Sequence, residues 1–240
     1  MQDFSGLDLA ALAFFLAAWF GYSFGVERLA ATGRSLNRLM DAQRRTWMRQ
    51  MILRENRIVD TTIMASLQNG TAFFASTSLL ALGGSLALLR STNEILDLFA
   101  DLPLGLATTK GAWELKVIGL VIIFIYAFFK FAWAYRLFNY AAILVGAVPV
   151  GTHNPEAFRA ADRAAAMNTV AGGHFNRGQR AFFFALAYLG WFVSAYLFLA
   201  TTAGVLFVMW RRQFASSARH ILVDEAQSED VHAETVSAKS

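Results

Sequence analysis

Residues 115–148 read LKVIGLVIIFIYAFFKFAWAYRLFNYAAILVGAV, and this stretch decides the class of fold. It holds no acid, and its only cations are Lys116, Lys130 and Arg136. A helix needs about 20 mainly apolar residues to cross the roughly 30 Å of hydrocarbon in a bilayer. After Lys116 the stretch is apolar as far as Phe129. It then continues past Lys130 and Arg136. It therefore predicts a helix that crosses a membrane and extends beyond it.

Three further stretches are apolar and long enough to cross, at about 7–26, 67–89 and 181–210. The composition agrees, because 56% of the 240 residues are hydrophobic and only 16% are charged. In soluble domains, roughly 45–50% of the residues are apolar and about 25% are charged. Cysteine is absent, which excludes disulfide scaffolds and thiolate metal sites. We expect an all-α integral membrane four-helix bundle over 1–222, with cytoplasmic helical extensions, followed by a disordered acidic tail over 223–240.

The distribution of basic residues predicts the direction of insertion. The residues before the first span include no Lys or Arg, so this span is not a cleaved signal peptide. The first connection, 27–66, holds eight arginines and the third, 150–180, holds four, whereas the middle connection, 90–116, holds three basic residues. Loops rich in Lys and Arg stay on the cytoplasmic side of a membrane. We therefore expect both termini outside the cytoplasm of a bacterial inner membrane, although Arg211 and Arg212 then lie on the outer side.

The two basic connections carry helix signals. Apolar residues recur at helical spacing in the first connection, with arginines between them: Leu36, Leu39, Met40, Trp47, Met48, Met51 and Ile52. This amphipathic helix either seals the base of the bundle or docks on the anionic membrane surface. In the second connection, Asn154 and Pro155 predict the start of a short helix that ends near Gly172 and Gly173.

Lys130 permits two interpretations. If the bilayer covers about 119–146, this cation lies deep in the membrane and suggests an ion pathway. If the bilayer covers about 113–131, the side chain reaches the inner interface. Aromatic residues that follow, namely Phe131, Trp133, Tyr135 and Tyr140, favour the interface.

Polar residues of three predicted helices are expected to converge at the cytoplasmic mouth of the bundle. The candidate ligand-binding residues are Arg57, Asp60, Asn69, Arg136, Asn139 and Arg180. In this hypothesis Arg136 and Arg180 contact an anion, while Asp60 orients Arg57. The two asparagines supply neutral hydrogen bonds. The same cluster is also compatible with a purely structural network that fixes the helix packing.

No motif identifies an enzyme, a metal site or a cofactor. The sequence has no H-E-x-x-H, P-loop or G-x-G-x-x-G motif. All four histidines, His153, His174, His220 and His232, lie outside the predicted spans, so a haem between helices is not expected. We therefore expect no cofactor and no metal. We also expect no nucleic-acid partner, because the basic helix has an apolar face as well. Small residues over 76–85 are compatible with a homo-oligomer as well as with internal packing.

Three functions stay open at this point. The leading one is an inner-membrane protein that binds or passes a small anionic or lipidic ligand at its cytoplasmic mouth. The second is a structural or scaffold membrane protein. The third is a membrane enzyme that acts on lipid, with Asp60, His174 or Glu55 as the acid–base group.

The order of several motifs resembles one membrane family. These motifs are Arg45-Thr46-Trp47-Met48, Glu55-Asn56-Arg57-Ile58-Val59-Asp60, Leu67-Gln68-Asn69, Phe73-Phe74-Ala75-Ser76-Thr77-Ser78, Tyr126-Ala127-Phe128-Phe129-Lys130-Phe131, Arg136-Leu137-Phe138-Asn139-Tyr140, Asn168-Thr169-Val170 and Arg180-Ala181-Phe182. The chain resembles the domain of unknown function 599 family of bacterial and plant multi-pass membrane proteins over about 7–214. The resemblance implies an integral membrane protein and no established activity, so it assigns no catalytic residue.

Overall fold

The computed structural model describes residues 4–30, 35–101, 109–151, 155–219 and 221–223, and every regular element in these ranges is helical. In chain order the elements are α1 (Gly6–Ala30), α2 (Leu36–Met51), α3 (Ile58–Arg90), α4 (Thr92–Asp101), α5 (Lys110–Ala147), α6 (Pro155–Tyr188), the 3₁₀ turn η1 (Leu189–Phe192) and α7 (Ala195–Phe214). The expected all-α class is confirmed. The expected tail, 223–240, lies almost entirely outside the described residues.

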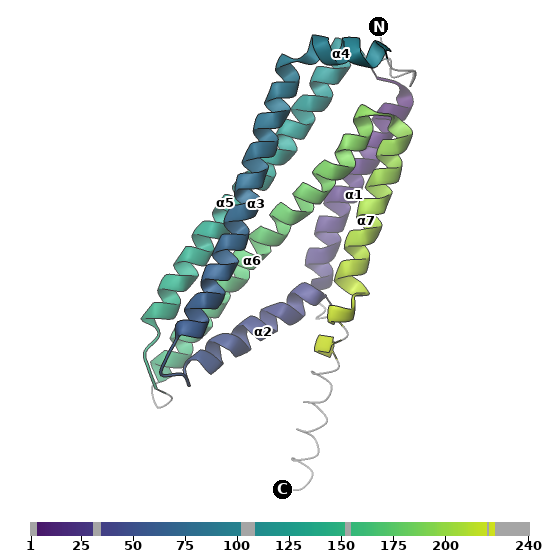
Figure 1. Cartoon of the computed structure of the whole chain (residues 1–240). Coiled ribbons are helices and arrows are strands. Elements are labelled where there is room, and N and C mark those ends of the chain that lie inside the picture. The colour runs from purple at the N-terminus through teal and green to yellow at the C-terminus, as the bar shows by residue number, and fades with distance from the viewer. Residues whose placement is uncertain (1–3, 31–34, 102–108, 152–154, 220, 224–240) are drawn as a thin grey trace.

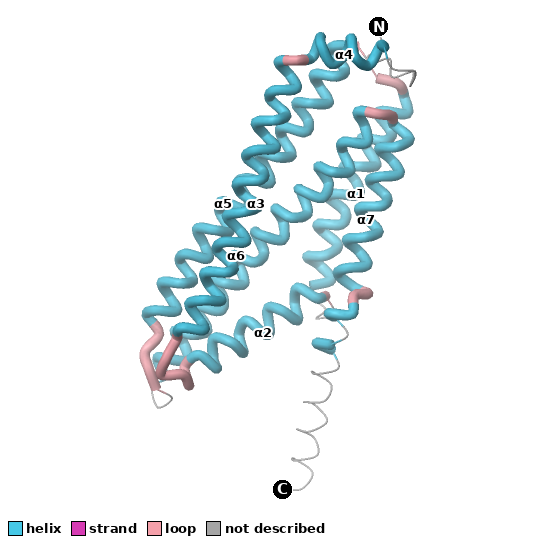
Figure 2. The backbone as a smooth tube through the Cα atoms, viewed as in Figure 1, coloured by secondary structure: helices cyan, strands magenta, loops and turns pink. Residues whose placement is uncertain are grey.

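The long helices α1, α3, α5, α6 and α7 run along the length of the molecule, and α4 and α2 lie across its two ends (Figure 1). We call these ends the α4 end and the α2 end. Helix α5 packs against both α3 and α6, while α1 packs mainly against α7. Helix α6 is inclined and connects the α3–α5 pair to the α1–α7 pair (Figure 2).

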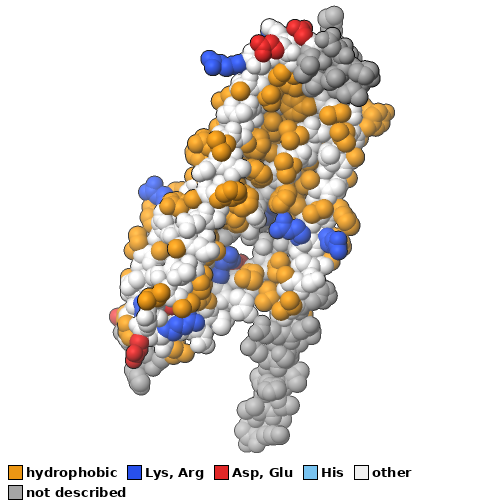
Figure 3. All heavy atoms as spheres, viewed as in Figure 1, with side chains coloured by type: hydrophobic (Ala, Val, Ile, Leu, Met, Phe, Trp, Pro, Cys, Tyr) orange, Lys and Arg blue, Asp and Glu red, His pale blue; other side chains and the backbone are white. Residues whose placement is uncertain are grey.

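Three helices are long and apolar enough to cross a membrane: α1 over Gly6–Val26, α3 and α5. They contain the first three predicted spans. Figure 3 shows that hydrophobic side chains cover much of the visible surface between the α4 end and the middle of the molecule. Most of the visible Lys and Arg side chains lie in the half toward the α2 end. An apolar surface of this kind suits lipid, and the basic end suits one side of a membrane.

The fourth predicted span, 181–210, is not one continuous helix. Helix α6 ends at Tyr188, the chain turns through η1, and α7 begins at Ala195 and runs back toward the α2 end. The Ser194 side chain caps α7 by accepting a hydrogen bond from the backbone N–H of Leu197. Both arms of this hairpin are apolar, so hydropathy alone gives one long stretch where the structure has two helices.

Close packing and one hydrogen bond hold the hairpin together. A Cβ added to Gly190 would lie 2.6 Å from Oγ1 of Thr201, so this position has no room for a side chain. The Thr201 hydroxyl lies 2.8 Å from the carbonyl oxygen of Ala187, to which it donates. Because of this turn, α7 ends beside α2, at the opposite end from the start of α1. A single span over 181–210 would instead have placed the end of this segment at the same end of the molecule as the start of α1.

A cation and a carboxylate fix the turn from outside. Asp8 accepts a hydrogen bond of 2.8 Å from Nε1 of Trp191, and Nζ of Lys116 donates across 2.9 Å to the carbonyl oxygen of the same tryptophan. The ammonium group also lies 5.3 Å from the centre of the indole ring. Carbonyl groups at the end of a helix carry partial negative charge, which a cation stabilises. Lys116 thus serves the packing of the α4 end.

Helix α6 begins at Pro155, as predicted, but the expected end near Gly172 and Gly173 is wrong. The helix spans 34 residues, and two of its glycines are close-packing positions within it. A Cβ on Gly172 would lie 2.8 Å from the guanidinium of Arg44, and one on Gly178 would lie 2.8 Å from the ring of Phe131. These glycines allow α2 and α5 to approach α6 closely.

The amphipathic helix in the first connection is confirmed as α2. Met48 and Met51 are fully buried, and Arg49 pairs with Asp162 of α6 at 3.0 Å. The hydrogen bond to Asp162 and the charge of its carboxylate raise the pKa of Arg49. Helix α2 packs mainly against α6, so its apolar face forms part of the protein core. This contact supports the interpretation that the helix seals the base of the bundle.

Candidate functional site

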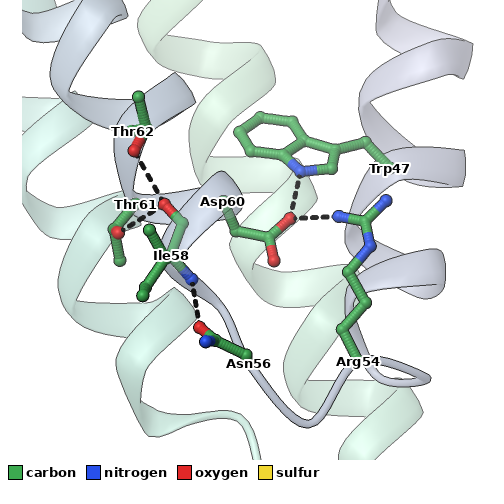
Figure 4. A network of polar contacts seen from close by, with 7 residues as sticks. All are labelled: Trp47, Arg54, Asn56, Ile58, Asp60, Thr61 and Thr62. Atoms are coloured by element: carbon green, nitrogen blue, oxygen red, sulfur yellow. Dashed lines mark hydrogen bonds and ion pairs between the residues drawn. The ribbon is translucent and has the colours of Figure 1, made fainter.

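Asp60, at the start of α3, is a fully buried carboxylate at the α2 end (Figure 4). Its Oδ1 accepts hydrogen bonds from Nε1 of Trp47 at 2.7 Å and from the guanidinium of Arg54 at 2.6 Å. Its Oδ2 is buried and has no hydrogen-bond partner within the described residues. The ion-pair partner of Asp60 is therefore Arg54, whereas we expected Asp60 to orient Arg57.

Arg57 instead caps the C-terminal end of α5. Its NH1 donates to the carbonyl oxygens of Val145 and Val148 at 3.0 and 2.7 Å, and its NH2 donates to that of Pro149 at 3.2 Å. The last carbonyl groups of a helix lack intrahelical partners and attract cations. These contacts use both terminal nitrogens of the guanidinium, so Arg57 acts as a helix cap that ties α3 to α5.

The two asparagines of the predicted site have different surroundings. Asn139 of α5 accepts a hydrogen bond of 2.7 Å from the side chain of Gln68 on α3. Asn69 is exposed, because the next position on a helix points about 100° away. Gln68 is absent from the six candidate residues, and helical periodicity relative to buried Met64 and Thr71 is the signal that favours it over Asn69.

Arg136 and Arg180 line two separate cavities. Arg136 is exposed on α5, where its Nε donates to the hydroxyl of Tyr140 at 2.7 Å. Arg180 lies on α6, and its residue is 7% exposed. The six candidate residues therefore do not form one mouth. Arg57, Asp60 and Asn139 lie where α3 meets α2 or α5. Asn69 faces outward, and Arg136 and Arg180 line different cavities.

A cavity with a largely polar lining lies beside Arg180, and we call it the Arg180 cavity. Its volume is about 130 Å³, and α1, α2, α6 and α7 all contribute to its wall. Its polar side chains are those of Tyr22, Asn37, Asn176, Gln179, Arg180, Arg212 and Gln213. No Asp or Glu occurs among the described residues that line it.

Several contacts set the shape of the Arg180 cavity. The Tyr22 hydroxyl donates to the carbonyl oxygen of Met209 at 3.0 Å and thereby ties α1 to α7. The guanidinium carbon of Arg212 lies 5.5 Å from the centre of the Phe183 ring, in cation–π geometry. Gln213 is 8% exposed, and its Nε2 has no hydrogen-bond partner within the described residues. A buried amide donor of this kind calls for an acceptor, which water or a ligand supplies.

This arrangement can bind an anion. Guanidinium and amide groups are all hydrogen-bond donors, and the planar guanidinium matches the oxygens of phosphate or carboxylate. Sequence reasoning included Arg180 but missed Arg212 and Gln213, because a single span over 181–210 places them at the opposite side of the membrane. The turn at η1 is what brings them back to Arg180.

Known proteins give one informative comparison. Searches of curated proteins and of solved structures found no match. The model of the family described as "Protein of unknown function, DUF599" matches residues 10–218, which is most of the chain. The chain therefore belongs to this family, DUF599, as the motif order predicted.

Proposed function

We propose that the chain is a multi-pass protein of the bacterial inner membrane that binds a small anion in the Arg180 cavity, from the cytoplasmic side. The observation that carries this proposal is the donor set of the cavity. Arg180, Arg212 and Gln213 line one small space, and Nε2 of Gln213 has no hydrogen-bond partner within the described residues. Its volume of about 130 Å³ suits a phosphate-sized anion with a few waters and leaves no room for an acyl chain.

The proposed orientation follows from the distribution of charge over the fold. In addition to α1, α3 and α5, we place α6 and α7 across the membrane, which gives five crossings. The arginines of α2 and the pair Arg211 and Arg212 then lie on one side, with α4 and the start of α1 on the other. Basic segments stay in the cytoplasm, so the α2 end and the end of α7 are cytoplasmic and the start of α1 is outside. The basic pair is no longer an exception.

A thermal unfolding experiment with inorganic phosphate tests the binding proposal. A ligand that binds only the folded state stabilises it, by about 2.7 kcal/mol at 100 times its Kd. We expect phosphate to raise the unfolding temperature of the purified full-length protein above that in chloride of equal ionic strength. Arg212→Gln should abolish this rise. Arg211→Gln is the matched control, because Arg211 is the adjacent cation and does not line the cavity.

Gln213→Met separates binding from packing. The amide nitrogen makes no hydrogen bond within the described residues, so its loss removes no hydrogen bond among them, and the similar length of methionine keeps the packing of this buried position. We expect this variant to unfold at the wild-type temperature in chloride but to need several times more phosphate for the same stabilisation. If wild type gains nothing from phosphate beyond chloride, or if Arg212→Gln gains as much as wild type, the proposed function is wrong.

A structural role is the second candidate function, and specific contacts favour it for part of the predicted site. Arg57 caps α5, and Asp60 joins α3 to Trp47 of α2 and to Arg54 of the loop that follows α2. Both residues hold helices together. A lipid-directed enzyme has no such support, because no hydrogen bond joins Asp60, Glu55 and His174 to one another within the described residues.

A further inference from the structure

A second concave surface lies on α5, on the outside of the helix assembly, and it differs in character from the Arg180 cavity. It is a groove of about 700 Å³ with an apolar wall and a cationic end. The wall includes Ile122, Ile125 and Phe129, and the cations are Lys130 and Arg136. We call it the α5 groove. Its volume lies in the range of sites that hold whole organic ligands, about 300–1,000 Å³.

The apolar wall of the α5 groove is open to the surroundings of the protein. Ile122 is 61% exposed and Phe129 is 65% exposed, on a helix that is apolar enough to cross a membrane. An aqueous surface with such large apolar side chains would be unfavourable, whereas a lipid chain packs well against them. The wall therefore fits an acyl chain.

The position of the cations along α5 fits the membrane boundary. Helix α5 begins at the α4 end with Lys110, which pairs with Glu114. Lys130 follows 20 residues later, which at 1.5 Å per residue is about 30 Å, the thickness of the hydrocarbon core. Arg136 lies about 9 Å further, at the depth of lipid headgroups. This spacing supports the interface interpretation of Lys130.

Aromatic side chains position both cations and leave most of their donors available. Nζ of Lys130 lies 5.1 Å from the centre of the Tyr126 ring. Arg136 uses Nε for the hydroxyl of Tyr140, and its guanidinium carbon lies 5.5 Å from the centre of that ring. No ion pair to either cation and no acidic lining residue occur in the part of the chain that the structure describes. Their charge is thus available to a ligand.

We infer that the α5 groove binds an anionic phospholipid, with its phosphate between Lys130 and Arg136 and one acyl chain along Ile122, Ile125 and Phe129. Charge complementarity selects the headgroup, because two cations stand where the phosphate of an inner-leaflet lipid lies. The apolar wall selects a lipid over a free anion. His174, from α6, closes the cationic end, with its ring 6.5 Å from that of Trp133. This inference is independent of the Arg180 cavity.

Native mass spectrometry of the full-length protein tests the lipid assignment. The protein is placed in nanodiscs of equal parts phosphatidylglycerol and phosphatidylcholine, and the lipid that stays bound on release is identified. We expect wild type to retain phosphatidylglycerol in preference to phosphatidylcholine. In the double variant Lys130→Gln, Arg136→Gln, the ratio of retained phosphatidylglycerol to phosphatidylcholine should fall by roughly tenfold or more. Arg90→Gln, an exposed cation at the α4 end, is the control and should behave as wild type.

Tryptophan quenching gives a second readout that does not depend on release from the nanodisc. Trp133 lines the groove, so brominated phosphatidylglycerol should quench its emission more than brominated phosphatidylcholine does. The difference should disappear in Trp133→Phe and in the double cation variant. Equal retention of both lipids by wild type, or an unchanged preference in the double variant, would overturn the inference. Displacement of the lipid by inorganic phosphate alone would also overturn it, since the groove would then take a free anion. Arg212→Gln should keep the lipid preference, which separates this test from that of the Arg180 cavity.

Discussion

The guanidinium of Arg54 lies 2.6 Å from the carboxylate of Asp60, and this pair joins the loop after α2 to the first turn of α3. The two partners are unequal, because Asp60 is fully buried whereas the Arg54 side chain is 41% exposed. The buried partner depends on the exposed one, since an unpaired carboxylate inside a protein is strongly unfavourable.

This asymmetry predicts that Arg54→Ala destabilises the protein by about 3 kcal/mol, the usual result of removing one partner of a buried charge. The free energy of unfolding, measured by chemical denaturation in detergent micelles, checks it. Arg45→Ala removes an exposed arginine of the neighbouring α2 and should change the stability by less than about 0.5 kcal/mol. Equal effects of the two substitutions would mean that Asp60 does not need Arg54.

Arg57 should be a structural residue whose role requires the two terminal nitrogens of a guanidinium group. Arg57→Ala removes the three hydrogen bonds to the end of α5, and we expect a loss of roughly 2 kcal/mol in stability. Arg57→Lys should recover only part of this loss, because an ammonium group cannot span the same carbonyl oxygens. The same denaturation assay measures both. Phosphate stabilisation should persist in these variants, which would distinguish a cap from an anion contact.

The contact between α5 and α6 should tolerate no side chain at Gly178. A methyl group there would lie 2.8 Å from the ring of Phe131, which is fully buried. We expect Gly178→Ala to cost about 1–3 kcal/mol through overpacking, despite the better helix propensity of alanine. Gly83→Ala is the control, because nothing lies within 4 Å of the added carbon. The prediction fails if both variants unfold at the same denaturant concentration.

The proposed five crossings put α4 and the segment after α7 on opposite sides of the membrane. The chain has no cysteine, so single substitutions give clean labelling sites. We expect Asn93→Cys, exposed in α4, to react with a membrane-impermeant maleimide in intact cells. Ser217→Cys, exposed after α7, should react only after permeabilisation. Labelling of both sites in intact cells would restore the four-crossing arrangement and would place Arg212 outside.

The candidate site was only partly accessible to sequence reasoning, and the reason differs between residues. Helical periodicity places Asp60 on a buried face, but the choice of Arg54 over Arg57 as its partner depends on how the loop after α2 folds. Arg180 was identified as a cation near the mouth. Its companions Arg212 and Gln213 were not, because they reach it only through the turn at η1.

Sequence alone determined the features that rest on local patterns. Continuous apolar stretches identified α1, α3 and α5, the spacing of Met48 and Met51 identified α2, and Pro155 marked the start of α6. The tertiary structure decided where 181–210 divides, because the residues on both sides of the turn are apolar and the turn depends on a close contact between Gly190 and Thr201. It also decided which polar groups share a cavity, since the Arg180 cavity combines side chains from four helices that are distant in the sequence.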